Sequence, residues 1–181
     1  TAAPSQNENY VMLLDSTSNV TLSRFRIEAR PPSGNFANAL VLQKGGTIAL
    51  DSLTVRVRGS INNANASAVV LLGNISNLSL TNSTIDSGYY SFRTAGEEGN
   101  YSNITLTNNT FHGFWSQAIV ARGVTNFTAN SNNIQGGISG SVNVNGRGLT
   151  GIYLAQSAGN ISVQKNKIVL VDSKTGGKTG I

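Results

Sequence analysis

The sequence predicts an all-β fold, a β-solenoid of about six coils that forms a single domain over residues 1–181. Two observations predict it: a nine-residue pattern recurs six times, and an apolar, strand-like segment precedes the copies. A strand-like unit repeated at intervals indicates a chain that winds into stacked coils instead of closing into a globule. The copies begin near Asn19, Thr47, Asn77, Asn103, Asn126 and Asn160.

Each copy of the pattern alternates apolar and small polar residues, which is typical of a strand with one buried face. We therefore expect three inward columns, to which every coil contributes one residue. The first column is Val20, Ile48, Leu78, Ile104, Phe127 and Ile161; the second is Leu22, Leu50, Leu80, Leu106, Ala129 and Val163; the third is Ile27, Val55, Ile85, Phe111, Ile134 and Ile168.

The segments around these copies complete the coils. Preceding strands are expected at residues 11–14, 40–42, 69–72, 118–121 and 151–154, with a weaker one at 90–92 followed by a loop at 97–102. Position seven holds Asn109, Asn132 and Asn166 in successive coils, and we expect them to hydrogen-bond along the stack at a bend. Residues 178–181 repeat the opening of the sixth coil, so we expect a longer β-helix, or ends covered by partners.

Composition narrows the classes of function. Thirteen basic and eight acidic residues give a net charge of +5 without a Lys/Arg run, so no nucleic-acid partner is expected. No cysteine is present, which excludes disulfides and thiolate metal sites, and we expect neither a metal nor a cofactor. Few charges, many Asn, Ser and Thr residues, and no apolar membrane span favour a secreted or cell-surface protein, of a bacterial type.

The segment from Asn103 to Phe111 reads Asn-apolar-Thr-apolar-x-x-Asn-x-Phe. It resembles the repeat of the right-handed parallel β-helix family, the pectate-lyase-like superfamily, and the resemblance covers roughly residues 10–172. It implies right-handed coils and a secreted or surface protein, often one that meets polysaccharide. Because one fold hosts many functions, it implies little about activity.

One exterior column carries most of the candidate chemistry. The residues directly after the third inward column include Arg56, Asp86 and His112, which adjacent coils should place roughly 4.8 Å apart along the stack. Because Asp86 is expected beside His112, the only His of the chain, and next to Arg56, these three residues are weak candidates for acid/base catalysis. The competing and stronger interpretation is an ordinary set of cross-strand charge pairs.

Aromatic residues follow this column on the same edge, with Tyr89 and Tyr90 in one coil and Phe114 and Trp115 in the next. Aromatic rings beside hydrogen-bonding groups suit sugars, whose ring faces are apolar and whose edges are polar. We therefore predict that these four residues bind a ligand, although they could equally pack a loop over the coils.

The favoured function is engagement of a polysaccharide or cell-surface glycan through this edge. The first alternative is an adhesin or passenger-like stalk without catalytic activity, which presents loops such as 94–102. The second is a polysaccharide lyase or glycoside hydrolase whose catalytic residues lie partly outside this chain, since the clustered carboxylates of such enzymes are missing here. Further coils of the same protein, or end-to-end self-association, are the other expected partners.

Overall fold

The computed structural model describes residues 9–30, 37–58, 63–95, 100–136, 149–170 and 178–179. Within these ranges the protein is all-β, as predicted, and its strands form two parallel sheets of ten and six strands. None of the described residues lies in a helix, so none forms a helix that could span a membrane. Residues 97–99, part of the expected loop, and 180–181 lie outside the described residues.

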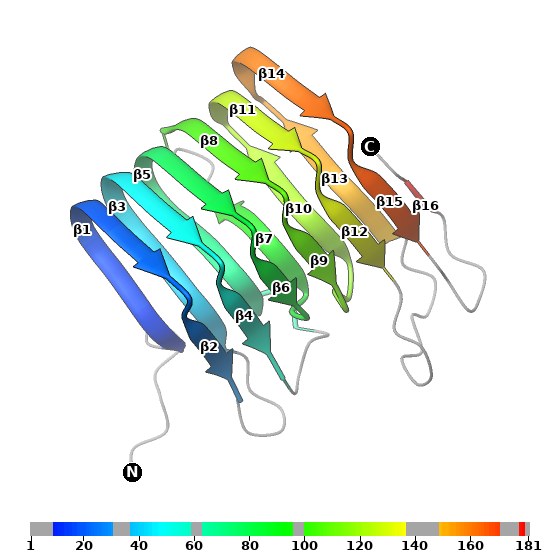
Figure 1. Ribbon diagram of the computed structural model, residues 1–181, viewed down its shortest axis with the longest axis horizontal. Helices are drawn as coiled ribbons and strands as arrows, with labels where there is room; N and C mark the ends of the chain where they lie inside the picture. Colours follow the sequence, from blue (N-terminus) through cyan, green and yellow to red (C-terminus); the bar gives the residue numbers. More distant parts are fainter. Residues whose placement is uncertain are drawn as a thin grey trace.

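The larger sheet contains the long strands of the repeat and the shorter pieces into which some of them divide. Neighbouring strands of this sheet come from successive repeats, which are stacked side by side from blue to red in Figure 1. Its strands are β1 (Tyr10–Ser23), β3 (Asn38–Asp51), β5 (Ser67–Thr81), β7 (Tyr90–Ala95), β8 (Tyr101–Thr107), β10 (Gln117–Arg122), β11 (Val124–Asn130), β13 (Leu149–Ala155), β14 (Ala158–Gln164) and β16 (Lys178–Thr179).

The smaller sheet contains one short strand from each repeat, and it lies beyond the arrowheads of the long strands in Figure 1. Its strands are β2 (Arg26–Ala29), β4 (Thr54–Val57), β6 (Thr84–Asp86), β9 (Thr110–His112), β12 (Asn133–Gly136) and β15 (Lys167–Leu170). Within the described residues, neighbouring strands of both sheets pair in parallel, as stacked repeats of a strand–bend–strand unit require.

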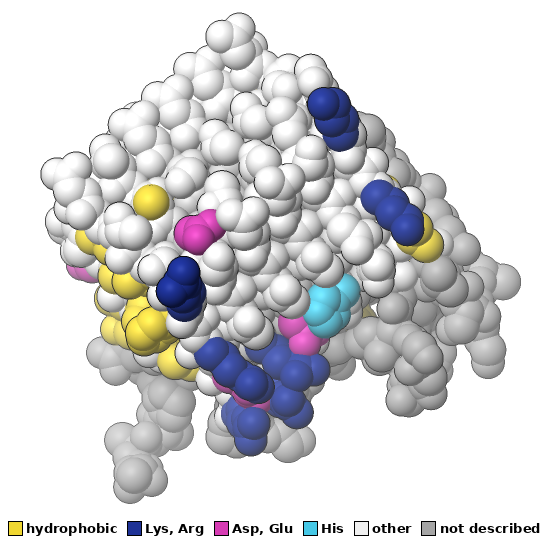
Figure 2. Space-filling model, viewed as in Figure 1, with side chains coloured by type: hydrophobic (Ala, Val, Ile, Leu, Met, Phe, Trp, Pro, Cys, Tyr) yellow, Lys and Arg dark blue, Asp and Glu magenta, His cyan; other side chains and the backbone are white. Residues whose placement is uncertain are grey.

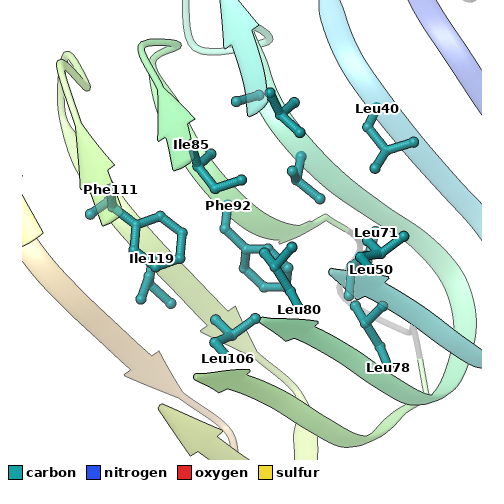
Figure 3. Packing of buried hydrophobic residues seen from close by; sticks show 14 of the residues in the cluster. Leu40, Leu50, Leu71, Leu78, Leu80, Ile85, Phe92, Leu106, Phe111 and Ile119 are labelled. Atoms are coloured by element: carbon teal, nitrogen blue, oxygen red, sulfur yellow. The ribbon is translucent and has the colours of Figure 1, made fainter. Parts of the chain in front are cut away.

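The strand register confirms the three inward columns. The first two columns pair residue by residue across the larger sheet, and the third does so across the smaller one. The columns meet in one apolar core, where Leu80, Ile85 and Phe111 are fully buried. Figure 3 shows side chains from opposite sheets pointing toward one another in this core.

The bend between the two sheets has the same backbone conformation in each repeat. The residue at position six of the pattern has a positive φ in all six copies, a left-handed conformation that Asn tolerates better than most residues. These residues are Arg24, Ser52, Asn82, Asn108, Ser131 and Lys165. The chain bends at this residue from the larger sheet to the smaller one, and the third column points into the same core as the first two (Figure 1).

Two details of the strands differ from the sequence prediction. The expected loop at 97–102 is wrong at its end, because Tyr101 and Ser102 belong to β8. Tyr101 is buried, and its hydroxyl proton is shared between the backbone oxygens of Leu71 (3.0 Å) and Ala95 (2.9 Å). The weak strand expected at 90–92 is confirmed and is longer than predicted, since β7 extends to Ala95.

Candidate functional site

The structure brings Arg56, Asp86 and His112 together on the outer face of the smaller sheet, as the repeat alignment predicts. These residues follow the third column on β4, β6 and β9, where they pair in direct register. Arg56 Nε lies 2.5 Å from Asp86 Oδ2, and His112 Nδ1 lies 3.2 Å from Asp86 Oδ1. Asp86 is the bridge of this group, since it contacts both neighbours.

The surroundings of Asp86 leave its carboxylate well partnered. Ser87 Oγ donates to Asp86 Oδ1 at 2.8 Å, and Asp86 is only 7% exposed. Gly113, with a φ of +68°, lets the backbone approach closely: a Cβ there would lie 2.8 Å from Asp86 Oδ1. This glycine position therefore keeps the space that the carboxylate occupies.

His112 is the member of the group with an open side. Its side chain is 38% exposed. When Nδ1–H of a neutral imidazole donates to Asp86, Nε2 is left as a proton acceptor toward solvent. Among the described residues, no group of three or more His, Cys, Asp and Glu side chains gathers into a possible metal site.

The four aromatic residues predicted to bind a ligand divide into buried and accessible ones. Tyr89 is 7% exposed and Phe114 is 1% exposed, so neither offers a ring face to a ligand in this structure. Phe114 packs where Gly136 leaves room, since a Cβ at Gly136 would lie 2.6 Å from the Phe114 ring. The aromatic side chains of Tyr89 and Phe114 are therefore explained by packing beneath the edge. Tyr90 and Trp115 are half-buried, so part of each side chain can still contact a ligand.

A second surface, which the sequence analysis missed apart from Tyr90, lies on the outer face of β7, β10 and β13. A shallow open groove of about 450 Å³ runs across these strands. Arg93, Val120 and Tyr153 pair in register across the three strands. The lining residues are Tyr90, Arg93, Thr94, Ala95, Gln117, Val120, Arg122 and Tyr153.

Two arginine–tyrosine pairs define the chemistry of this groove. The Arg93 guanidinium carbon lies 5.2 Å from the Tyr90 ring centre, and that of Arg122 lies 5.8 Å from the Tyr153 ring centre. Burial lowers the pKa of Arg93 from its usual value, and its Nη atoms donate to the backbone oxygens of Ala64 and Asn65. Tyr153 is 36% exposed, so its ring remains accessible beside the arginine.

An alignment of the second strands could have identified this groove. Once the segments expected at 90–92 and 118–121 are extended by one residue each and aligned with 151–154, their exterior positions fall on one face, in the same way as the column that contains Asp86. The nine-residue pattern does not include Arg93, Arg122 and Tyr153, so the exterior columns that it defines do not contain them.

Comparison of the chain with protein-family models, with curated proteins and with solved structures finds no match.

Proposed function

We propose that the protein is an extracellular β-solenoid of the right-handed parallel β-helix type, which binds polysaccharide through the groove over β7, β10 and β13. The repeat register and the single core that both sheets enclose support the solenoid. A solenoid provides a long, regular surface on which an extended chain can lie across successive strands.

The observation that carries the binding proposal is the pair of Tyr–Arg contacts at Tyr90–Arg93 and Tyr153–Arg122. A tyrosine ring packs against the apolar face of a sugar, while neighbouring polar groups bond to its hydroxyls. An arginine beside the ring holds it in place and supplies donors of its own. Gln117, the register partner of Tyr90 on β10, also lines the groove and adds an amide that both donates and accepts.

Tyr90 and Tyr153 lie two strands apart, because β10 separates β7 from β13. The distance between their strands is therefore roughly 10 Å, twice the usual spacing of neighbouring strands. Tyr90 is in register with Gln117, whereas Tyr153 is in register with Val120, three residues further along β10, so a glycan that meets both rings crosses the strands diagonally. This spacing supports recognition of a polymer over recognition of a single sugar.

The edge formed by Asp86, His112 and Trp115 is the competing glycan surface. It keeps an exposed imidazole and a half-buried indole, but the burial of Tyr89 and Phe114 removes two of its expected rings. The groove retains two accessible tyrosines, and for this reason we place the glycan there.

The test is a glycan-array scan of the wild-type protein beside three single variants. Tyr153→Ala is expected to weaken binding by about tenfold or more, because it removes both a sugar-facing ring and the arginine contact. Phe25→Ala is the matched control, an exposed aromatic residue at the bend before β2. Loss of binding in Trp115→Ala with full binding in Tyr153→Ala would move the site to the Asp86 edge.

A stalk without ligand-binding activity is the second candidate. The hydrogen bonds that link Asn109, Asn132 and Asn166 across successive repeats favour it, because such bonds stiffen the stack. A blank array for the folded wild-type protein would reject the glycan proposal in favour of this one.

A further inference from the structure

A cluster of arginines gathers around Glu28 at one end of the smaller sheet. Residues 27 and 29 of β2 and 55 and 57 of β4 point into the core, so the residues between and after them share the outer face. These outward residues are Arg26, Glu28, Arg30, Arg56 and Arg58. Figure 2 shows the Lys and Arg side chains gathered below the single His.

One carboxylate holds three of these guanidinium groups. Arg26 Nη2 lies 2.8 Å from Glu28 Oε2, while Arg30 Nε and Arg58 Nε lie 2.6 Å and 2.5 Å from Glu28 Oε1. Arg56, the register partner of Glu28, instead contacts Asp86. We call Arg26, Arg30 and Arg58 around Glu28 the arginine cluster.

The arginine cluster has more donors and more positive charge than Glu28 can satisfy. Three guanidinium groups carry about fifteen N–H donors, whereas a carboxylate offers about four acceptor positions. Three positive charges against one negative charge leave two uncompensated. The arginine side chains are 63%, 68% and 46% exposed for Arg26, Arg30 and Arg58, so their spare donors can be reached from solvent.

Glu28 also keeps the arginines in place. Its hydrogen bonds to Arg30 and then Arg26, with the nearby positive charges, lower its pKa from 4.5 to about 2, so it stays ionised at neutral pH. A guanidinium whose one edge is held by a carboxylate has less freedom to lose when its other edge binds an anion.

We propose that the arginine cluster is a binding site for a tetrahedral oxyanion, the sulfate or phosphate group of an anionic ligand. Guanidinium forks bind such groups through paired, charge-assisted hydrogen bonds, and three forks from two strands can meet oxygens that point in several directions. The two oxygens of a planar carboxylate ligand point in fewer directions than those of a tetrahedral group, so a carboxylate fits the three forks less well. The site lies on the smaller sheet, whereas the glycan groove lies on the larger one, so this inference does not depend on the proposed function.

Binding of dextran sulfate to the full chain, measured by calorimetry at constant ionic strength, tests the site, with unsulfated dextran as the reference polymer. The double variant Arg30→Gln/Arg58→Gln is expected to lose about tenfold or more in affinity, because it removes two charge-assisted contacts. The matched control is Lys165→Gln/Lys167→Gln, which makes the same change in charge at exposed lysines near and in β15. This control is expected to lose less than about threefold, through long-range attraction alone.

Competition with inorganic sulfate and inorganic phosphate distinguishes the sources of the group. Displacement of dextran sulfate by either ion assigns the site to the isolated oxyanion, and resistance assigns it to a polymer that carries several such groups. The loss expected in Arg30→Gln/Arg58→Gln should be confined to dextran sulfate and leave any binding of unsulfated dextran as it is in the wild-type protein, which separates this test from that of the groove. Equal losses in the two double variants, or no binding by the folded wild-type protein, would overturn the proposal.

Discussion

At the scale of single residues, polar side chains inside the bend matter most. Asn132 Oδ1 accepts the backbone N–H of Asn109 at 2.9 Å, and Asn132 Nδ2 donates to the backbone oxygen of Leu106 at 2.9 Å. Asn166 makes the same two bonds one repeat further on: it accepts from the backbone N–H of Asn132 and donates to the backbone oxygen of Ala129. Asn109 does so one repeat earlier, with the N–H of Ser83 and the oxygen of Leu80. The expected stack of asparagines is therefore confirmed, and it satisfies backbone groups that the bend removes from the sheet ladders.

Removal of one ladder side chain leaves two buried backbone groups without partners. Asn132→Ala is expected to lower the free energy of unfolding by about 2–6 kcal/mol, since each of the two unsatisfied buried groups costs about 1–3 kcal/mol. Asn133→Ala is the control, because the neighbouring side chain lies on the outer face of β12 and should change stability by less than about 1 kcal/mol. Urea denaturation of the two variants measures both; equal, small losses would mean that water replaces the ladder.

At the scale of strands, the short sheet combines an apolar inner face with a charged outer face. β2, β4, β6 and β9 place Glu28, Arg56, Asp86 and His112 in consecutive register, so the signs alternate from Glu28 to Asp86. Cross-strand pairs of opposite charge favour this register, while a slip by one residue would turn the charges into the core.

The β2–β4 end of this sheet should respond to acid. The folded-state pKa of Glu28, about 2, lies below its ordinary value of 4.5 because of hydrogen bonds to Arg30 and Arg26. The contacts therefore stabilise the fold above pH 4.5, and their contribution is lost as the pH falls from 4.5 toward 2. Melting temperatures across this window should fall less steeply in Glu28→Gln than in the wild-type protein.

The control for this prediction is Asp15→Asn, which changes an exposed carboxylate on β1 that accepts a hydrogen bond from its neighbour Ser16. Its melting temperature should fall between pH 4.5 and pH 2 as steeply as that of the wild-type protein. High salt should reduce the difference in melting temperature between the wild-type protein and Glu28→Gln. An equally steep fall of the melting temperature in Glu28→Gln and in the wild-type protein would contradict a stabilising role for ionised Glu28.

At the scale of the whole molecule, burial is deepest in the central repeats and weakest at both ends. Leu80 and Leu106 are fully buried, whereas the equivalent Leu22 and Val163 of the outer repeats are only partly buried. Tyr10, Val11 and Phe25 are exposed at one end, and Ile161 and Val169 are exposed at the other. Edge strands with apolar side chains are templates for pairing with another chain.

We therefore expect the protein to self-associate end to end. Light scattering should show an average mass that rises with concentration, and the double variant Ile161→Lys/Val169→Lys should reduce that rise because it charges the β14–β15 edge. Phe25→Lys changes the opposite end and should also reduce it. A mass that stays constant over a wide concentration range would contradict the expectation.

The sequence alone determined the strand register and the position of the bends. A repeat whose members are aligned predicts which residues are neighbours, and this placed Asp86 between Arg56 and His112 and stacked Asn109, Asn132 and Asn166. The alignment succeeds because parallel stacking brings equivalent positions of successive repeats together whatever the length of the loops between them. It therefore works for strands that contain the pattern and is silent about segments outside it.

Only the tertiary structure decided which side chains are accessible. Tyr89 and Phe114 look equivalent to Tyr90 and Trp115 in the sequence, but the fold buries the first of each pair. Tyr89, Phe114 and Trp115 lie between strands, where the two-residue alternation of a strand does not assign the inward side. The groove between Tyr90 and Tyr153 and the convergence of three arginines on Glu28 also depend on packing between strands. Exposure and side-chain convergence are properties of the assembled surface, which no single repeat contains.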